Sequence, residues 1–188
     1  MKTKDLAYIA LFAAIVAVLG LLPPVPVPGI PVPITAQTLG VMLAGSVLGA
    51  RRGGLALLVF LAVVAVGLPV LSGGRGGLGV FVGPSAGYLY SWPIAAFVIG
   101  LLTQLFWRRF NLAWALVANL VGGLLVIYAI GIPFTSLYAD IPLWTSFTGA
   151  LAFIPGDLVK AVAASLVAVA VHKAYPVIDR PARRATAG

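Results

Sequence analysis

Asp157 and Lys160 are two ionisable side chains of opposite charge inside a long apolar stretch near the end of the chain. Residues three apart on an α-helix project from the same face, so the carboxylate and the ammonium can meet each other or share a ligand. At 1.5 Å per residue, Lys160 lies about 18 Å from His172, where this stretch ends. That depth is past the middle of a bilayer core about 30 Å thick, where a single charge costs about 2.5–3.5 kcal/mol. We therefore expect the two charges to satisfy each other or a polar ligand.

Two interpretations of this charged pair are open. The pair either neutralises itself and joins helices, or it binds a ligand. Buried ion pairs stabilise proteins poorly compared with apolar packing, which favours the ligand site. Pro155 and Gly156 precede the pair and weaken the helix there, and helix breaks at membrane depth usually line a cavity. We expect Asp157 and Lys160 to face a cavity that opens outward.

Other polar side chains fall within or between the apolar stretches. Any one of them is more typical of a hydrogen bond between helices than of a ligand contact, but as a set they favour a polar cavity lining. Arg75 lies in a glycine-rich segment, where it can meet either an anionic substrate or a lipid phosphate. The set within the apolar stretches is Gln37, Thr38, Tyr88, Tyr90, Asn119 and Tyr128.

The elements that position these side chains are expected to lie in lipid. Of the 188 residues, 62% are hydrophobic and 9% are charged, whereas a soluble domain has roughly 45–50% apolar and about 25% charged residues. A helix needs about 20 apolar residues to cross a bilayer. The sequence predicts one all-α membrane domain over 1–188, with the second and third of six transmembrane helices forming a tight hairpin. The predicted spans are 5–22, 35–50, 53–70, 84–106, 111–131 and 148–172.

The basic residues predict the orientation of these spans. The net charge is +8, but the twelve Lys and Arg residues fall in small clusters between apolar runs, which argues against a nucleic-acid surface. The positive-inside rule assigns the side that carries ten of them to the cytoplasm, so both termini are expected there. An even number of spans requires the same. These ten residues are Lys2, Lys4, Arg51, Arg52, Arg108, Arg109, Lys173, Arg180, Arg183 and Arg184.

The loops on the other side have unusual compositions. Residues 23–33 contain six prolines and predict a stiff, extended strap. Residues 73–79 contain five glycines, which indicates either a flexible connector or a backbone that approaches a ligand closely. The fifth loop is expected to hold Phe134, Tyr138, Trp144 and Phe147, which suit a membrane interface or a lid.

Several kinds of chemistry are excluded by composition. The chain has no cysteine, and His172 is its one histidine, so neither a disulfide nor a metal site is expected. It has no Gly-x-x-x-x-Gly-Lys-Ser/Thr motif, so it is not expected to hydrolyse ATP itself. It has no glutamate, so it carries no His-Glu-x-x-His motif either. We expect neither an enzyme nor a bound cofactor.

The first apolar segment carries small residues at helical spacing. Lys2 and Lys4 ahead of it resemble a signal peptide, but the prolines at 23–26 make a poor cleavage site, so we expect this helix to be retained. Ala10 and Ala14 form a face that another helix can approach closely, as do Ala13 and Ala17. That other helix belongs either to this chain or to a partner.

Five stretches, in this order, resemble the BioY family, the biotin-specific S components of energy-coupling factor (ECF) transporters. The resemblance covers nearly the whole chain. It implies six helices in the bacterial cytoplasmic membrane, with biotin captured near the outer surface under the first and third outer loops. It also implies a transmembrane coupling protein and two ABC-type ATPases as partners. The stretches are VPITAQTLG (32–40), GGRGGLG (73–79), VGPSAGY (82–88), NLVGG (119–123) and FIPGDLVK (153–160).

The resemblance also assigns roles to residues. The family's acidic and basic pair on the last helix corresponds to Asp157 and Lys160, and its partner-binding face to Ala10 and Ala14. Biotin has a ureido ring with two N–H donors and one carbonyl, an apolar thiophane and a carboxylate. Our hypothesis is that Asp157 accepts from a ureido N–H and Lys160 donates to the ureido oxygen. Asn119 is expected beside the ring, and Trp92, Tyr88 or Phe81 on the apolar part. Gln37 and Arg75 are further expected substrate contacts. Arg75 departs from the family pattern.

Two other functions compete with this interpretation. A self-sufficient secondary transporter would use Asp157 as a proton site, but no internal two-fold repeat is evident. An intramembrane enzyme using the charged pair is less favoured still. The sequence leaves open whether the chain forms a homo-oligomer among the membrane lipids around it.

Overall fold

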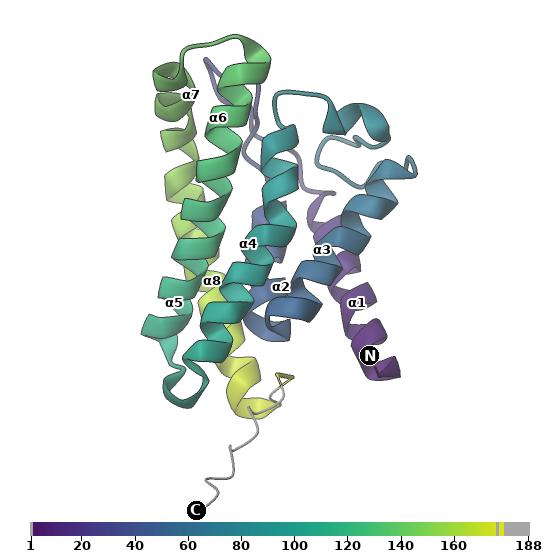
Figure 1. Cartoon of the computed structure of the whole chain (residues 1–188), viewed down its shortest axis with the longest axis vertical. Helices are drawn as coiled ribbons and strands as arrows, with labels where there is room; N and C mark the ends of the chain where they lie inside the picture. The colour runs from purple at the N-terminus through teal and green to yellow at the C-terminus, as the bar shows by residue number, and fades with distance from the viewer. Residues whose placement is uncertain (1, 176, 179–188) are drawn as a thin grey trace, which may run out of the picture.

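The chain folds into a bundle of helices, which the computed structural model describes for residues 2–175, 177 and 178 (Figure 1). A π-helical turn, η3 (Val121–Val126), joins α5 to α6, and a 3-10 turn, η4 (Leu151–Phe153), joins α7 to α8. Two further 3-10 turns are η1 (Leu78–Phe81) and η2 (Trp107–Arg109). The α-helices are α1 (Thr3–Leu19), α2 (Gln37–Leu48), α3 (Ala50–Ala65), α4 (Ala86–Leu105), α5 (Leu112–Leu120), α6 (Ile127–Ala139), α7 (Leu143–Ala150) and α8 (Ile154–Ala174).

Three helical segments are long and apolar enough to cross a membrane: Ala86–Leu105, Leu112–Ala139 and Leu143–Ala174. Helices α1, α2 and α3 have 17, 12 and 16 residues, fewer than the roughly 20 that a crossing needs. The shortest of them, α2, packs against α1, α3, α4 and α8, so neighbouring helices cover most of its surface. Each predicted span overlaps at least one helix, and the last two spans each overlap three helical elements. The number of membrane crossings stays a prediction.

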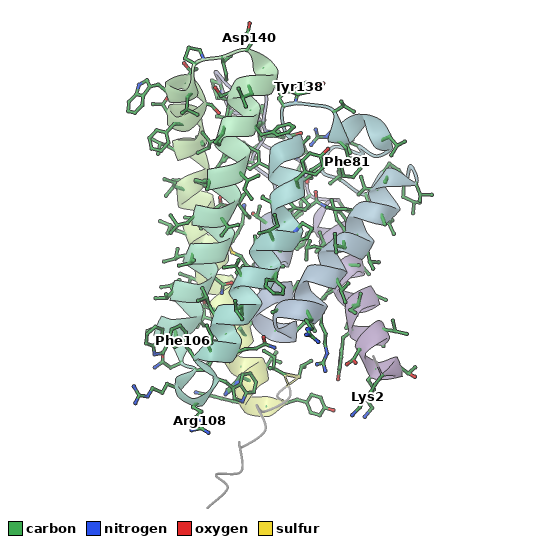
Figure 2. The ribbon with its side chains drawn as sticks, in the orientation of Figure 1. Lys2, Phe81, Phe106, Arg108, Tyr138 and Asp140 are labelled. Carbon is green, nitrogen blue, oxygen red and sulfur yellow. The ribbon has the colours of Figure 1, made fainter. Side chains whose placement is uncertain are left out.

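The two ends of the bundle differ in charge. Lys2 and Arg108 lie at one end, which we call the basal end, and Tyr138 and Asp140 lie at the opposite, distal end (Figure 2). The start of α3 is also basal, because Arg52 forms an ion pair with Asp5 of α1 at 2.9 Å. Lys2, Arg52 and Arg108 thus lie at the same end, as the charge pattern predicts, whereas Arg180, Arg183 and Arg184 lie outside the described residues. Which side of the membrane this end faces stays a prediction.

The tight hairpin between α2 and α3 turns two residues earlier than the charge pattern suggests. We expected Arg51, Arg52 and Gly53 to form the connection, but α3 already begins at Ala50. Gly49 is the turn residue, with φ of +81°, a backbone conformation that is accessible to glycine at little cost. The two arginines therefore occupy the first turn of a helix.

The expected fifth loop is mostly helical. Helix α6 continues to Ala139 and α7 begins at Leu143, so the four aromatic residues assigned to this loop lie on helices instead. Pro133 lies inside α6 without ending it. The chain reverses at Asp140, which has a left-handed φ of +51°. Composition alone missed this because apolar and aromatic residues continue the helix past the predicted end of the span.

Two distal loops cover the space between the helices. The proline-rich loop (residues 20–36) is not a single extended strap: it folds back at Gly29, and Val25 and Ile34 exchange two backbone hydrogen bonds of 2.9 and 2.8 Å. The glycine-rich loop (residues 66–85) makes a tight turn in which the Leu71 N–H donates to the Arg75 carbonyl at 3.0 Å.

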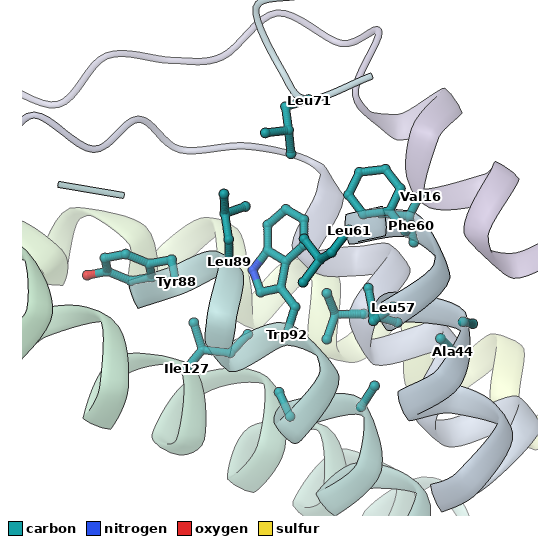
Figure 3. Packing of buried hydrophobic residues seen from close by; sticks show 14 of the residues in the cluster. Val16, Ala44, Leu57, Phe60, Leu61, Leu71, Tyr88, Leu89, Trp92 and Ile127 are labelled. Carbon is teal, nitrogen blue, oxygen red and sulfur yellow. The ribbon is translucent and has the colours of Figure 1, made fainter. Parts of the chain in front are cut away.

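The apolar core lies between α1, α2, α3, α4 and α6. Phe60, Leu61 and Val16 gather on one side of the Trp92 indole, and Leu89, Tyr88 and Ile127 lie on its other side (Figure 3). The Phe60 and Trp92 ring centroids are 6.0 Å apart. This packing holds the middle of α4 firmly, which fixes the position of the residues that α4 presents to the cavity described next.

Candidate functional site

A small cavity lies beneath the two distal loops, with a volume of about 50 Å³. Its walls come from segments far apart in the sequence. They are the end of the proline-rich loop (Val32–Thr35), Gln37 and Thr38 of α2, Leu71 and Arg75 of the glycine-rich loop, Ser85, Tyr88, Leu89 and Trp92 around α4, Ile127 and Tyr128 of α6, and Phe153, Asp157 and Lys160. The cavity therefore joins apolar walls to a few polar groups, as ligand sites usually do.

Asp157 and Lys160 line this cavity together, as their spacing predicts. The Lys160 Nζ lies 2.8 Å from the Asp157 Oδ1, and the Asp157 side chain is only 5% exposed. Pro155 is the second residue of α8, which begins directly after the 3-10 turn η4. The predicted weakening of the helix therefore takes the form of a junction between α7 and α8. The pair is placed in the first two turns of α8.

The three N–H donors of the Lys160 ammonium all have acceptors. Besides Asp157, they are the Thr35 carbonyl at 2.6 Å and the Thr38 Oγ1 at 2.9 Å. An ammonium has three donors and no acceptor, so this arrangement leaves no N–H free for a ligand. Lys160 instead ties α8 to the end of the proline-rich loop and to the start of α2.

The Asp157 carboxylate retains some capacity to accept hydrogen bonds. Its Oδ1 accepts from Lys160 and, at 3.3 Å, from the Thr38 Oγ1. Within the described part of the chain, its Oδ2 accepts only from the Tyr128 hydroxyl, at 2.7 Å. Each carboxylate oxygen has two lone pairs. One lone pair on Oδ2 therefore remains for a donor from a ligand. Thr38 and Tyr128 were among the polar residues noted in the apolar segments, but only the fold shows that they hold this carboxylate.

Gln37 also lines the cavity, but its amide is fully hydrogen-bonded. Its Nε2 donates to the Val16 carbonyl at 3.0 Å and to the Val70 carbonyl at 3.1 Å. Its Oε1 accepts from the Ser72 backbone N–H at 3.0 Å and from the Ser72 hydroxyl at 3.3 Å. These bonds use both donors and both lone pairs of the amide. Gln37 thus connects α1, α2 and the glycine-rich loop.

Tyr88 and Arg75 lie where a substrate can contact them. Tyr88 is 8% exposed, and its ring packs edge-to-face on Phe153 with centroids 5.9 Å apart. Arg75 donates from Nε to the Ser72 carbonyl at 3.2 Å. Together with Ser85, Arg75 lines both this cavity and a shallower hollow of about 420 Å³ among the distal loops. The positively charged Arg75 side chain therefore lies between the buried cavity and the surface of the distal loops.

Asn119 is not brought to the cavity, contrary to our expectation. It is fully buried between helices, where its Nδ2 donates to the Ser165 Oγ at 3.0 Å and its Oδ1 accepts from the Ser46 Oγ at 3.4 Å. Ser165 lies five residues past Lys160 on α8, which is about 7.5 Å further toward the basal end. Asn119 makes an interhelical hydrogen bond, the alternative that its sequence context also allowed. Phe81, a suggested apolar contact, packs against Tyr90 instead, with ring centroids 6.0 Å apart.

The small residues of α1 divide between two faces. Ala10 and Ala14 are exposed on the outside of the bundle, whereas Ala13 is 7% exposed and faces its interior. Packing within the chain therefore accounts for Ala13 and does not account for Ala10 and Ala14. Among the described residues, no group of three His, Cys, Asp or Glu side chains is placed to hold a metal ion.

Comparison with known proteins gives consistent matches over nearly the full length. The sequence model of the BioY family matches residues 1–177. A protein of Rhizobium etli named as a biotin transporter is 50% identical, covering 97% of this chain and 100% of that protein. A Rhodobacter capsulatus protein of the same name is 48% identical over 92% of this chain and 95% of its own length.

The fold has a match among solved structures. The crystal structure at 2.1 Å of the S-component for biotin from an ECF-type ABC transporter superposes with a TM-score of 0.87 at 37% identity. The match covers 92% of this chain and 95% of that one. The all-helical bundle is thus an S-component fold, and the chain is a multi-pass membrane protein. With the family match and these two relatives, the sequence and the fold agree: this chain belongs to the BioY family.

Proposed function

We propose that this chain captures biotin and takes part in its uptake across the bacterial cytoplasmic membrane, as the substrate-binding subunit of an ECF-type transporter. The observation that carries the proposal is the cavity with the buried Asp157–Lys160 pair, in a chain of this family. The chemistry of the cavity suits a ligand with a polar ring at one end, an apolar middle and an anionic end.

The polar groups suggest how biotin lies in the cavity. Asp157 Oδ2 accepts one ureido N–H, because it is the carboxylate oxygen with capacity left. Tyr88 packs on the apolar thiophane. Arg75 attracts the valerate carboxylate from the loop side of the cavity, where its guanidinium lies near the distal surface. Lys160 neutralises Asp157 and holds it in place, instead of donating to the ureido oxygen as we first expected.

The other predicted contacts act indirectly in this proposal. Gln37 positions the glycine-rich loop over the cavity, and Asn119 holds α2, α5 and α8 together below it. The cavity volume of about 50 Å³ corresponds to only about three to five waters. Biotin has sixteen heavy atoms, so its entry requires the distal loops or the cavity side chains to move apart.

The membrane arrangement that we propose has six crossings with both termini in the cytoplasm, and the distal loops on the outer face. The basic residues at the basal end support it. The partners are a transmembrane coupling protein and ABC-type ATPases, and we propose that the coupling protein contacts the exposed face of α1 at Ala10 and Ala14. Transport energy then comes from partner subunits, since this chain has no nucleotide-binding motif.

Binding of labelled biotin to the purified chain in detergent tests this proposal. The wild-type chain should bind, and Asp157→Asn should weaken binding by about 2 kcal/mol or more, roughly 30-fold in Kd, because the lost charge leaves Lys160 unbalanced and weakens the acceptor. Asp140→Asn is the matched control, since Asp140 is an exposed carboxylate in the turn after α6. Equal affinities for the wild type and Asp157→Asn would refute the site.

A further inference from the structure

One buried hydrogen-bond donor at the cavity has no partner. The Trp92 side chain lines the cavity and the residue is only 4% exposed, and its Nε1 makes no hydrogen bond within the described part of the chain. Buried N–H groups are nearly always paired, so each exception calls for an explanation. The indole N–H is a donor only, and the missing partner must therefore be an acceptor.

The indole nitrogen lies on the cavity side of the ring. In Figure 3 the nitrogen is on the side of Leu89, Tyr88 and Ile127, which all line the cavity, and away from Phe60 and Leu61, which pack the opposite side. An acceptor that enters the cavity can reach this N–H without disturbing the core behind the ring.

Two strong donors that contact Asp157 are already occupied. Lys160 donates to three acceptors, and the Tyr128 hydroxyl donates its one proton to Asp157. The Trp92 N–H is thus a donor in this part of the cavity that a ligand can use without breaking an existing bond.

Trp92 and Asp157 lie at similar depth. Both α4 and α8 run from the distal to the basal end (Figure 1), and their starts are aligned by the contact between Tyr88 and Phe153. Trp92 and Asp157 each lie four residues further along, about 6 Å deeper. The free acceptor on Asp157 Oδ2 cannot bond a ligand carboxylate, which has no donor, whereas Arg75 attracts that carboxylate from the loop side. The neutral end of the ligand therefore occupies this depth.

We propose that the Trp92 Nε1–H donates to the carbonyl oxygen of the ligand's ureido ring, while Asp157 Oδ2 accepts from one of the ring's N–H groups. The inference rests on the proposed function, since it requires biotin in this cavity. It makes Trp92 a specificity-determining residue that recognises a cyclic urea by its acceptor, a role that its aromatic character alone does not suggest.

The test combines a change in the protein with a change in the ligand. Trp92→Phe keeps an aromatic ring and removes the N–H, and Trp114→Phe is the matched control, because Trp114 stacks on Phe106 outside the cavity. The ligands are biotin and its thiourea analogue, in which a weakly accepting sulfur replaces the ureido oxygen. Trp92→Phe should lower the affinity for biotin about 5- to 100-fold. It should also bring the ratio of the two affinities close to one.

The outcomes separate this inference from the proposed function. The first outcome is that the wild type binds biotin and Asp157→Asn weakens binding, but the affinity ratio is the same in Trp92→Phe as in the wild type. In that case the inference fails and the proposed function stands. If the wild type binds no biotin, both fail. Should Trp92→Phe not fold, 3-benzothienylalanine at position 92, which has the indole shape without the N–H, replaces it, and an unchanged ratio again overturns the inference.

Discussion

The charged pair at the cavity can be tested for its two possible roles by removing one charge at a time and then both. Lys160→Met leaves the Asp157 carboxylate buried, with only Thr38 and Tyr128 as donors. Asp157→Asn removes the negative charge that balances the ammonium and leaves it only neutral acceptors, among them Thr35 and Thr38. Removing one partner of a buried ion pair costs about 3–5 kcal/mol of unfolding free energy. We expect each single variant to be destabilised by an amount in this range.

The double variant, Asp157→Asn with Lys160→Met, should recover most of that loss. Replacing both members of a buried pair is often neutral for stability, because no uncompensated charge remains. The recovery should appear as a coupling energy of about 2 kcal/mol or more between the two positions. Biotin binding should not recover, since the carboxylate that accepts the ureido N–H is absent in both Asp157 variants.

Two measurements on the same four proteins decide between the roles. Unfolding by a denaturing detergent, followed by circular dichroism, gives the stability, and equilibrium binding of labelled biotin gives the affinity. A double variant that binds biotin within about threefold of the wild type would show that the pair only joins helices. Single variants as stable as the wild type would contradict the buried ion pair itself.

Three further predictions concern residues whose roles the fold separates. Gln37→Leu should destabilise the chain by about 1–3 kcal/mol, because it leaves buried groups of the glycine-rich loop unpaired. Hydrogen exchange at the Ser72 backbone N–H should become faster, and unchanged exchange would remove Gln37 from its positioning role. Asn119→Leu should lower stability but alter biotin affinity less than about threefold, since Asn119 lies outside the cavity. A larger loss of affinity would make Asn119 a substrate contact again. Ala14→Leu should leave biotin binding by the isolated chain intact. It should prevent uptake in cells that also express the coupling protein and ATPases, because a larger side chain blocks close helix approach. Normal uptake would place the partner interface elsewhere.

The sequence alone supported the features that depend on local spacing and composition. The three-residue spacing of Asp157 and Lys160 places both on one helix face wherever the helix lies. The apolar runs predicted six membrane spans, and each of these ranges contains helical residues. The order of the motifs indicated the family. Helix ends were less predictable, because the residues after 131 are as apolar as those before it and α6 continues through them.

Tertiary structure decided which polar groups are available to a ligand. Gln37 and Asn119 are similar amides in apolar segments, but one is hydrogen-bonded at the edge of the cavity and the other is sealed between helices. Lys160 has no donor left, whereas Trp92, which looked purely apolar in the sequence, has one. The physical reason is that residue type sets how many hydrogen bonds a group can make, while only the packing of distant segments determines how many are already made.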